Sequence, residues 1–313
     1  LQAYELDDTN PYVLAGLGDV YRKLCKFDES AKYYDAILKD DNRNLFALRG
    51  AGDARRGMKE PQQAIPFWLR YLEINPKDSH VMVRVADAYH KLHDAENAIA
   101  FYEHALEVST NDPFALLGLG NVYYAQHEDT KALLCFETLL KNKSQNVVVM
   151  TMTGNIYRRR KEFDRAMDHY QDALQLEPTN NFALFGMGDC YRGKKNMEKA
   201  VEWWDKILEH EPENQALWTR VGDALLSLER VDDAVEHYQA SLNNGPDVYS
   251  YLGMARAQHA RGDLNSAREF CETALSHDET NERVLEKLIE ICEQSGDLAA
   301  ADEAREKLAR AAE

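Results

Sequence analysis

The sequence contains no apolar run of the length of a membrane-spanning helix and no N-terminal leader with a basic start and an apolar middle. Its mean hydropathy is -0.57. Because a membrane-spanning helix needs about 20 mostly apolar residues, insertion of this stretch of chain into a membrane is excluded. Positive charge is scarce as well, since 37 basic residues oppose 54 acidic ones and the formal net charge is -17. This charge repels phosphate backbones and anionic lipid surfaces, so we expect no nucleic-acid partner.

Paired cysteines and clustered metal ligands are also lacking. The cysteines include no CxxC pair, which argues against a zinc ribbon and a disulfide framework; they are Cys25, Cys135, Cys190, Cys271 and Cys292. Four of them replace apolar or small residues on helix faces of the repeat, as buried cysteines commonly do. We therefore expect unpaired thiols and a reducing compartment such as the cytoplasm. The nearest histidine pair, His90 and His93, has no carboxylate or cysteine set around it. We therefore expect two solvated histidines and no metal site.

Motifs that carry catalysis are absent too. No glycine-rich phosphate loop follows a strand pattern, and no GxSxG sequence occurs. The many carboxylates fall on predicted helix surfaces, where acidic side chains are ordinarily solvated. The sequence therefore predicts a chain without enzymatic activity and without a cofactor.

What the sequence does contain is an internal repeat. Its clearest marker is a series of evenly spaced alanines, in which a single step is shorter by one position: Ala64, Ala98, Ala132, Ala166, Ala200, Ala234, Ala267 and Ala301. Aligned on this series, nine units begin at Pro11, Leu45, Ser79, Pro113, Val147, Asn181, Gln215, Val248 and Glu282. The period, about 34 residues, predicts a solenoid in which each unit buries one face against the next.

Each unit has the pattern of two helices. Apolar or small residues at positions 4, 7, 8 and 11 of the unit form one stripe of a first helix. Position 8 is almost always glycine or alanine, position 20 of the second helix is the alanine series, and position 24 is mostly aromatic. A glycine within a helix costs about 0.5 to 1 kcal/mol relative to alanine, so its recurrence indicates close approach of the two helices. The large ring at position 24 is expected to fill the space beside the small residues.

This pattern resembles the tetratricopeptide repeat over essentially the whole chain. The residues that carry the resemblance in unit seven are Trp218, Val221, Gly222, Leu225, Ala234, Tyr238 and Pro246. In unit four they are Leu116, Leu119, Gly120, Tyr123, Ala132 and Phe136. The resemblance implies an all-α fold, a right-handed superhelical α-solenoid whose first helices line a concave groove and whose second helices form the convex back.

Several places depart from the regular repeat. Residue 1 is Leu, and residues 1–10 match the end of a second helix, so we expect a truncated upstream repeat and a longer parent protein. Residues 11–313 form the nine tandem repeats. Their last helix, at about residues 299–312, is rich in alanine and charged residues, which is typical of a solvated cap at the end of such an array. Pro66 lies within a predicted second helix and predicts a kink or a late start there. Unit eight follows a one-residue deletion, which predicts a changed helix angle.

A second stripe of the first helix, at positions 2, 5, 9 and 12, lies about 130° from the core stripe and is expected to face the groove. Position 9 carries short carboxylates and amides in seven successive units. Position 2 carries an aromatic ring in several units, and position 12 carries arginine in four. The candidate groove residues are Tyr12, Asp19, Arg22, Phe46, Asp53, Arg56, Asp87, Phe114, Asn121, Tyr124, Asn155, Arg158, Phe182, Asp189, Arg192 and Asp223.

Two interpretations of this stripe stay open. A ladder of carboxylates and amides could bind the backbone of an extended peptide, with arginines for its acidic side chains and aromatic rings for its apolar ones. Alternatively, Asp19 and Arg22, Asp53 and Arg56, and Asp189 and Arg192 are simple intrahelical pairs worth about 0.2 to 0.5 kcal/mol each. The row of aromatic rings favours an interface, because exposed rings are a costly surface. The lysine and asparagine clamp by which some tetratricopeptide proteins hold chaperone C-termini is not supported here.

The function that the sequence favours is a non-enzymatic scaffold that binds a protein or peptide segment in the groove, centred on units two to six. Two alternatives remain open, namely a self-association module that forms homo-oligomers and a regulatory arm that recruits substrates to a larger enzyme. The repeat pattern does not identify the partner, because it specifies the geometry of the scaffold and not the ligand that the scaffold binds.

Overall fold

A computed structural model describes residues 10–142 and 145–311, and within these ranges the regular structure is entirely α-helical. The first helices of the pairs are α2 (Pro11–Lys23), α4 (Leu45–Gly57), α6 (Ser79–Lys91), α8 (Pro113–Ala125), α10 (Val147–Arg159), α12 (Asn181–Gly193), α14 (Gln215–Ser227), α16 (Val248–Ala260) and α18 (Glu282–Ser295). The second helices are α3 (Phe27–Asp40), α5 (Pro61–Ile74), α7 (Ala95–Val108), α9 (Asp129–Lys141), α11 (Phe163–Leu176), α13 (Met197–Leu208), α15 (Val231–Asn243), α17 (Leu264–His277) and α19 (Leu298–Ala311).

The first helices begin where they do because each is preceded by an Asn or Asp cap. The side chain of the capping residue accepts a hydrogen bond from a backbone N–H of the first turn, as Asn180 does from Ala183 at 3.1 Å. The capping residues are Asn10, Asn44, Asp78, Asp112, Asn146, Asn180, Asn214, Asp247 and Asn281. Such a cap contributes about 1 kcal/mol to a helix, so every unit carries its own start point.

The turn between the two helices of a pair also repeats. In each unit the residue at position 15 has a positive φ, which places it in the left-handed region that ends many helices. In the last two units this residue is glycine, Gly262 and Gly296, whereas the earlier units use larger residues such as Lys59 and Glu229. The tight connection folds the second helix back onto the first.

Small residues and large rings interlock within each of the first seven pairs. The alanines of position 20 are completely buried, as are the rings of Tyr34, Trp68 and Trp204. A Cβ atom added at Gly188 would lie 2.2 Å from Nε1 of Trp204, which is far inside van der Waals contact. The predicted close approach of the two helices is confirmed, and the reason for the recurring glycine is the ring that lies over it.

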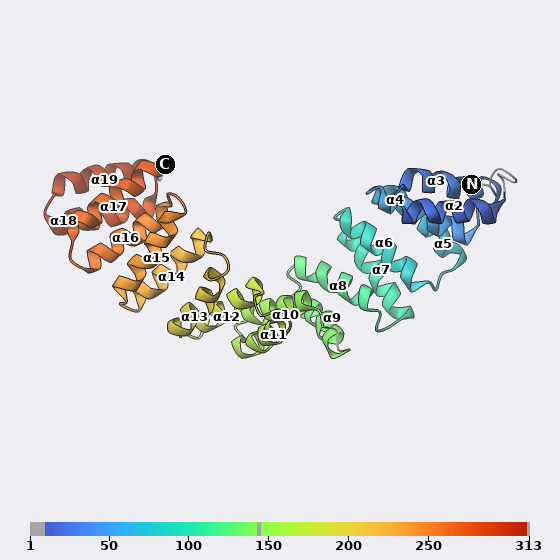
Figure 1. Cartoon of the computed structure of the whole chain (residues 1–313), viewed down its shortest axis with the longest axis horizontal. Helices are drawn as coiled ribbons and strands as arrows, with labels where there is room; N and C mark the ends of the chain where they lie inside the picture. The colour runs from blue at the N-terminus through green and yellow to red at the C-terminus, as the bar shows by residue number, and fades with distance from the viewer. Residues whose placement is uncertain (1–9, 143–144, 312–313) are drawn as a thin grey trace. The chain divides into compact units, whose positions relative to one another are not determined.

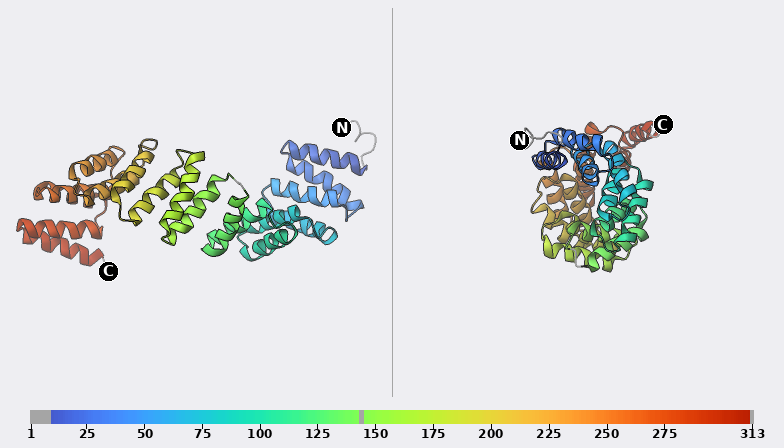
Figure 2. Two further views of the ribbon diagram at one scale, coloured as in Figure 1. Left: turned by 90° about the horizontal axis from the view of Figure 1, so that it is seen from below. Right: turned by 90° about the vertical axis from the view of Figure 1, so that its right-hand side faces the viewer.

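The helix pairs form two compact units, each made of several repeats. We call Leu1–Thr153 the first unit and Gly154–Glu313 the second unit, and their border falls within α10 (Figure 1). In the first unit α2 packs against α3 and α3 against α4, and in the second α12 packs against α13 and α13 against α14 (Figure 2). The core of the second unit runs through successive pairs, from Leu184 past Trp204 and Tyr238 to Ala257. The predicted all-α fold of tandem helix pairs is confirmed.

The late helix start at Pro66 is wrong, because α5 begins at Pro61 and continues through Pro66, whose ring is exposed near the beginning of the helix. The last helix runs from Leu298 to Ala311, and residues 312–313 lie outside the described chain. The upstream segment expected at residues 1–10 also lies outside it, except for Asn10, which caps α2. In the described part of the chain, no helix has the length and apolar character needed to cross a membrane.

Candidate ligand-binding surface

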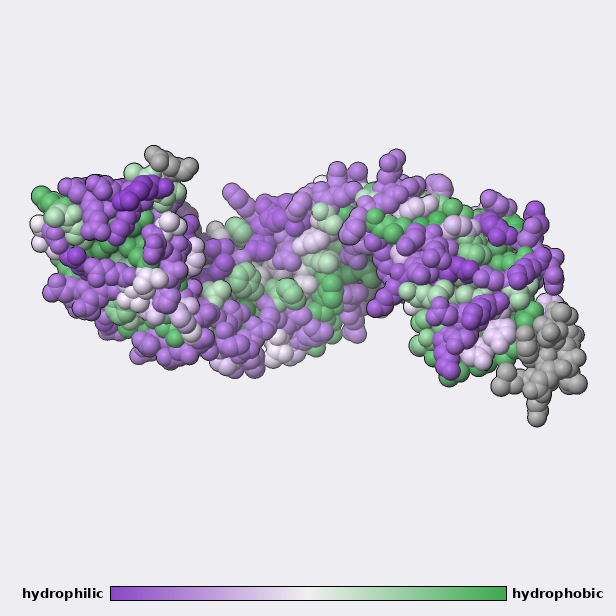
Figure 3. All heavy atoms as spheres, turned by 90° about the horizontal axis from the view of Figure 1, so that it is seen from above, coloured by the Kyte–Doolittle hydropathy of each residue, from purple (hydrophilic) through white to green (hydrophobic). Residues whose placement is uncertain are grey.

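Aromatic side chains at position 2 of the first helices are solvent-exposed. The exposed fraction is 87% for Tyr12, 66% for Phe114 and 76% for Phe182, and Phe46 and Tyr249 are also exposed. On the face seen in Figure 3, hydrophobic and hydrophilic residues are interspersed over both units. Exposed rings of this kind are available to a partner, because they are not buried in the core of their own helix pair.

The side chains at position 9 are held by the second helix of their own pair. The hydroxyl of the position-24 tyrosine donates a hydrogen bond to the position-9 side chain at 2.6 to 2.8 Å. The four pairs are Tyr34 with Asp19, Tyr102 with Asp87, Tyr170 with Asn155, and Tyr238 with Asp223. Position 9 of the second stripe is therefore engaged with its own helix pair, because this side chain accepts a hydrogen bond from the buried tyrosine.

Burial and the neighbouring carboxylates raise the pKa of Tyr34, Tyr102 and Tyr238. Their hydroxyls therefore stay protonated and act as donors. Burial opposes ionisation of Asp19, but hydrogen bonds from Arg22 and Tyr34 lower the pKa of its carboxyl overall. The acceptor is thus an ionised carboxylate, which makes the bond charge-assisted.

We call a unit with tyrosine at position 24 a tyrosine unit, and likewise for tryptophan and phenylalanine. After each tyrosine unit, position 6 of the next unit is glycine. A Cβ atom added at Gly50, Gly118, Gly186 or Gly253 would lie 2.2 to 2.4 Å from the ring of the preceding tyrosine. These glycines occupy position 6. Where position 24 is Trp or Phe, position 6 of the next unit carries a long side chain instead: Arg84 after Trp68, Met152 after Phe136, and Arg220 after Trp204. Units one to seven therefore alternate between two kinds of unit, with an effective period of two repeats.

In the two tryptophan units, arginines take the place of the tyrosine hydroxyl. Asp53 is buried, with Arg84 at 3.4 Å and Arg56 at 3.9 Å. Asp189 is buried in the same way and is paired with Arg192 at 3.0 Å and Arg220 at 3.3 Å. A third arginine, Arg158 from α10, also donates to Asp189. A buried aspartate flanked by the arginine of its own helix and an arginine of the next first helix thus occurs once in each compact unit, whereas the third arginine occurs only in the second.

The phenylalanine unit has neither arrangement. Phe136 carries no hydroxyl, and among the described residues the buried Oδ1 of Asn121 finds no hydrogen-bond donor. Tyr124, one turn further along α8, lies 6.4 Å from Phe136 between ring centroids. Asn121 is therefore held by packing rather than by the hydrogen bond that fixes position 9 in the tyrosine units.

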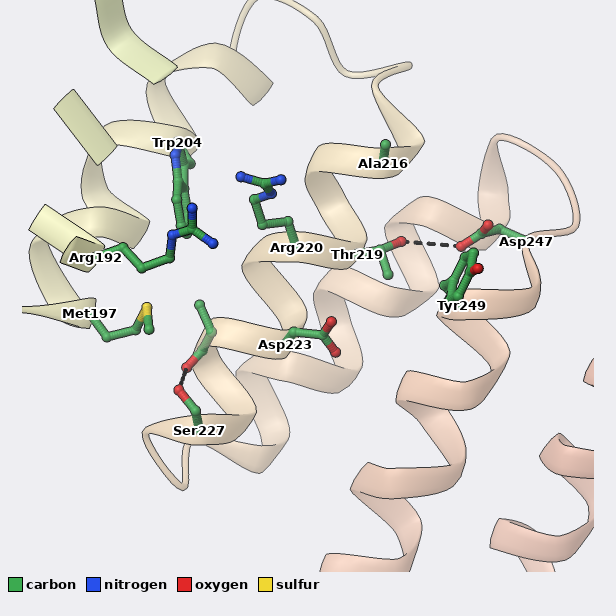
Figure 4. Close-up of a pocket in the computed structure, with 11 residues that line it drawn as sticks. Arg192, Met197, Trp204, Ala216, Thr219, Arg220, Asp223, Ser227, Asp247 and Tyr249 are labelled. Atoms are coloured by element: carbon green, nitrogen blue, oxygen red, sulfur yellow. Dashed lines mark hydrogen bonds between the residues drawn. The ribbon is translucent and has the colours of Figure 1, made fainter. Parts of the chain in front are cut away.

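Two cavities lie along the first helices of the second unit. One, of about 460 Å³, is lined by Asn155, Arg158, Asn181, Phe182, Phe185, Ile207, Glu211, Asn214, Ala216, Leu217 and Arg220. The other, of about 450 Å³, is lined by Arg192, Met197, Trp204, Thr219, Asp223, Asp247, Tyr249 and further residues of α14 (Figure 4). Both include Ala216 and Arg220, so they are neighbours. In Figure 4, Arg192 and Arg220 extend from α12 and α14 toward Trp204.

The structure brings together part of the predicted set. In the second unit, Asn155, Arg158 and Phe182 line one cavity, whereas Arg192 and Asp223 line its neighbour, and Asp189 is buried beneath them. In the first unit, Arg56 and Asp87 line a cavity of about 410 Å³. The remaining candidates of the first unit, Tyr12, Asp19, Arg22, Phe46, Asp53, Phe114, Asn121 and Tyr124, line none of these cavities. The three intrahelical pairs that the spacing predicts are present. The distances are 2.9 Å for Asp19 with Arg22, 3.9 Å for Asp53 with Arg56 and 3.0 Å for Asp189 with Arg192.

Sequence reasoning missed Arg220 and Phe185. Arg220 stands at position 6, which was not assigned to either stripe, and its signal was the replacement of a recurring glycine by arginine directly after a tryptophan unit. Phe185 lies at position 5, where neighbouring units carry no comparable ring. Within residues 10–142 and 145–311, no group of three or more His, Cys, Asp and Glu side chains is placed to hold a metal ion.

Tandem helix pairs with exposed rings and cavities along their first helices define an α-helical repeat scaffold, a class that is typically non-catalytic. Profiles described as "Tetratricopeptide repeat" match residues 79–112, residues 149–180, and the overlapping segments 204–249 and 219–284. These segments of the chain are similar to tetratricopeptide repeats, and repeats of this family mediate binding of proteins and peptides. No enzyme family is among the matches.

Solved structures show the same fold. A tetratricopeptide repeat protein from Parabacteroides merdae is 15% identical, with a TM-score of 0.55 over 78% of this chain and 97% of that chain. YrrB, described as a TPR protein with an unusual peptide-binding site, is 23% identical, with a TM-score of 0.53 over 62% and 97%. Pseudomonas aeruginosa pilF is 18% identical, with a TM-score of 0.51 over 66% and 95%. At these identities the likeness concerns the fold alone. The comparison with curated proteins finds no match.

Proposed function

We propose that this protein is a non-enzymatic scaffold that binds an extended segment of a partner protein along the first helices of its second unit. The observation that carries the proposal is the pair of adjoining cavities that share Arg220. They extend over α10, α12, α14 and α16, so a single extended segment can occupy both. Phe182 and Tyr249, both exposed, lie at these cavities and offer apolar contact area.

The chemistry of the lining suits a peptide. Apolar side chains such as Leu217 and Phe185 can receive an apolar side chain, whereas the amides and guanidinium groups can bind backbone carbonyls and acidic groups. Binding to a preformed groove avoids much of the ordering cost, because the lining side chains are mounted on rigid helices.

The test is a peptide display selection against the full chain, followed by affinity measurement with variants. We expect Phe182→Ala to weaken the selected peptides about tenfold or more, because a ring anchor of this size commonly contributes over 1 kcal/mol to an interface. Binding would be measured by fluorescence anisotropy of the labelled peptide.

The matched control is Leu134→Ala, which removes a similarly exposed apolar side chain from the second helix α9. It should leave the affinity unchanged. Equal affinity of Phe182→Ala and the unmodified protein, for every selected peptide, would show that the partner binds elsewhere.

A further inference from the structure

Three arginines from three successive first helices converge on one buried carboxylate. Asp189 accepts hydrogen bonds from Arg158 of α10 and from Arg220 of α14 at 3.3 Å, and pairs with Arg192 of its own helix at 3.0 Å. Three positive charges facing one negative charge leave an excess of two within a protein whose net charge is -17. The arginines repel one another, and an additional anion would relieve that repulsion.

Arg158 reaches Asp189 because its own helix offers it no carboxylate. Three residues before it, at position 9, stands the neutral Asn155. The corresponding arginine of unit one, Arg22, instead bonds to Asp19 of its own helix at 2.9 Å. The exchange of Asp for Asn at position 9 thus explains why a third arginine joins the cluster in the second unit.

The carboxylates that line the two cavities are engaged elsewhere. Asp223 accepts a hydrogen bond from Tyr238 at 2.8 Å, and Asp247 caps α16. Glu211 accepts hydrogen bonds from two amide side chains, one of them that of Asn214 at 3.2 Å. Asp223 also lies 3.7 Å from Arg256. Among the described residues, the ion pairs of Arg158, Arg192 and Arg220 are all with Asp189, so no direct contact with Glu211, Asp223 or Asp247 cancels the positive excess there.

The arginines are held in place before any ligand arrives. The guanidinium of Arg220 lies 4.8 Å from the ring centroid of Phe185 and 5.7 Å from that of Trp204, and that of Arg192 lies 6.0 Å from Trp204. Figure 4 shows both arginines beside Trp204. The buried Nε of Arg158 finds no acceptor in the described part of the chain. Side chains fixed in this way lose little freedom when they bind an anion.

We propose that Arg158, Arg192 and Arg220 form a subsite for an acidic side chain of the bound peptide, and that a large apolar side chain next to it enters the cavity of Phe182, Phe185 and Leu217. This inference rests on the proposed function and adds the chemistry of its ligand. Its support is charge complementarity, since the cluster has an excess of positive charge and the adjoining cavity supplies the apolar contact. The planar guanidinium groups match the two oxygens of a carboxylate.

The probe is a set of four synthetic libraries of acetylated, amidated nonapeptides. The central residue is Glu, Gln, phosphoserine or Lys, the next residue is Phe, and the other positions are random but free of Cys and acidic residues. Retention of each library on the immobilised full chain is measured by mass spectrometry. We expect the Glu library to be retained about tenfold more than the Gln library, because a carboxylate forms charge-assisted bonds that the amide cannot.

Two variants probe the arrangement itself. Arg158→Gln with Arg220→Gln should abolish the preference for Glu over Gln. Asn155→Asp should reduce that preference while keeping every arginine, because it places a carboxylate where Asp19 stands in unit one and draws Arg158 back to its own helix. The control, Arg230→Gln, alters an exposed arginine that pairs with Asp233 of α15 and should leave the preference intact. Thermal unfolding followed by circular dichroism checks that each variant is folded.

The outcomes separate this inference from the function on which it rests. Equal retention of the Glu and Gln libraries, or a preference that survives both variants, overturns the acidic subsite and leaves the scaffold function standing. Strong retention of phosphoserine without a preference for Glu over Gln also overturns it and indicates a phosphoryl ligand. Retention of no library by the unmodified chain contradicts the proposed peptide binding itself.

Discussion

Replacing Trp204 with alanine is expected to lower the free energy of unfolding of the second unit by about 3 to 5 kcal/mol, the range typical for truncating a buried aromatic ring. The indole is completely buried between α12 and α13, where it covers Gly188. Among the described residues its Nε1 finds no hydrogen-bond acceptor. The loss is therefore one of packing and transfer energy rather than of a hydrogen bond.

The measurement is urea denaturation followed by circular dichroism. Repeat arrays can unfold in stages, so the transition assigned to the second unit is the one to compare. The control is Phe182→Ala, which also truncates an aromatic ring but at a site that is 76% exposed. It should change the free energy by no more than about 0.5 kcal/mol. Similar losses for the two variants would contradict the burial that places Trp204 in the core.

Replacing Gly186 with alanine is expected to lower the free energy of unfolding by about 1 to 3 kcal/mol, although alanine is the better helix former. A Cβ atom at this position would lie 2.3 Å from Cζ of Tyr170, whose ring is completely buried and cannot move aside. The added methyl group would push α11 and α12 apart. The hydrogen bond from Tyr170 to Asn155 is expected to lengthen as a result.

The matched control is Gly16→Ala, at the same position of unit one. There an added Cβ would meet nothing within 4 Å among the described residues outside its own helix. This variant should gain about 0.5 to 1 kcal/mol from the lower conformational entropy of the unfolded chain. The two substitutions therefore have opposite expected signs, and the same sign in urea denaturation would refute the contact with Tyr170.

The fold was predictable from the sequence because its determinants are local and recur in every unit. The alanines at position 20 and the glycines at position 8 indicated close helix pairs, and the structure buries them beneath rings such as Trp68 and Trp204. Of the two effects expected at Pro66, the late helix start was wrong, because α5 begins at Pro61 and the missing backbone donor of Pro66 does not stop the helix. The kink stays a prediction.

The candidate surface was only partly predictable. The exposed ring of Phe182 and the pair of Asp189 with Arg192 follow from helical spacing within one helix. The hydrogen bonds from the position-24 tyrosines could not be found in this way, because they join residues 15 apart on two helices whose angle the spacing does not specify.

The sequence by itself determined the repeat, the helix pairs, the aromatic row at position 2 and the acidic overall charge, because each depends on composition or on periodicity along one helix. Only the tertiary structure decided which of two neighbouring carboxylates each arginine joins. Arg22 stays with its own helix, whereas Arg158 crosses to Asp189 and meets Arg220 there. The physical reason is that the acceptor to which a long side chain binds depends on distance and burial in three dimensions. Those acceptors lie on helices that are far apart in the sequence.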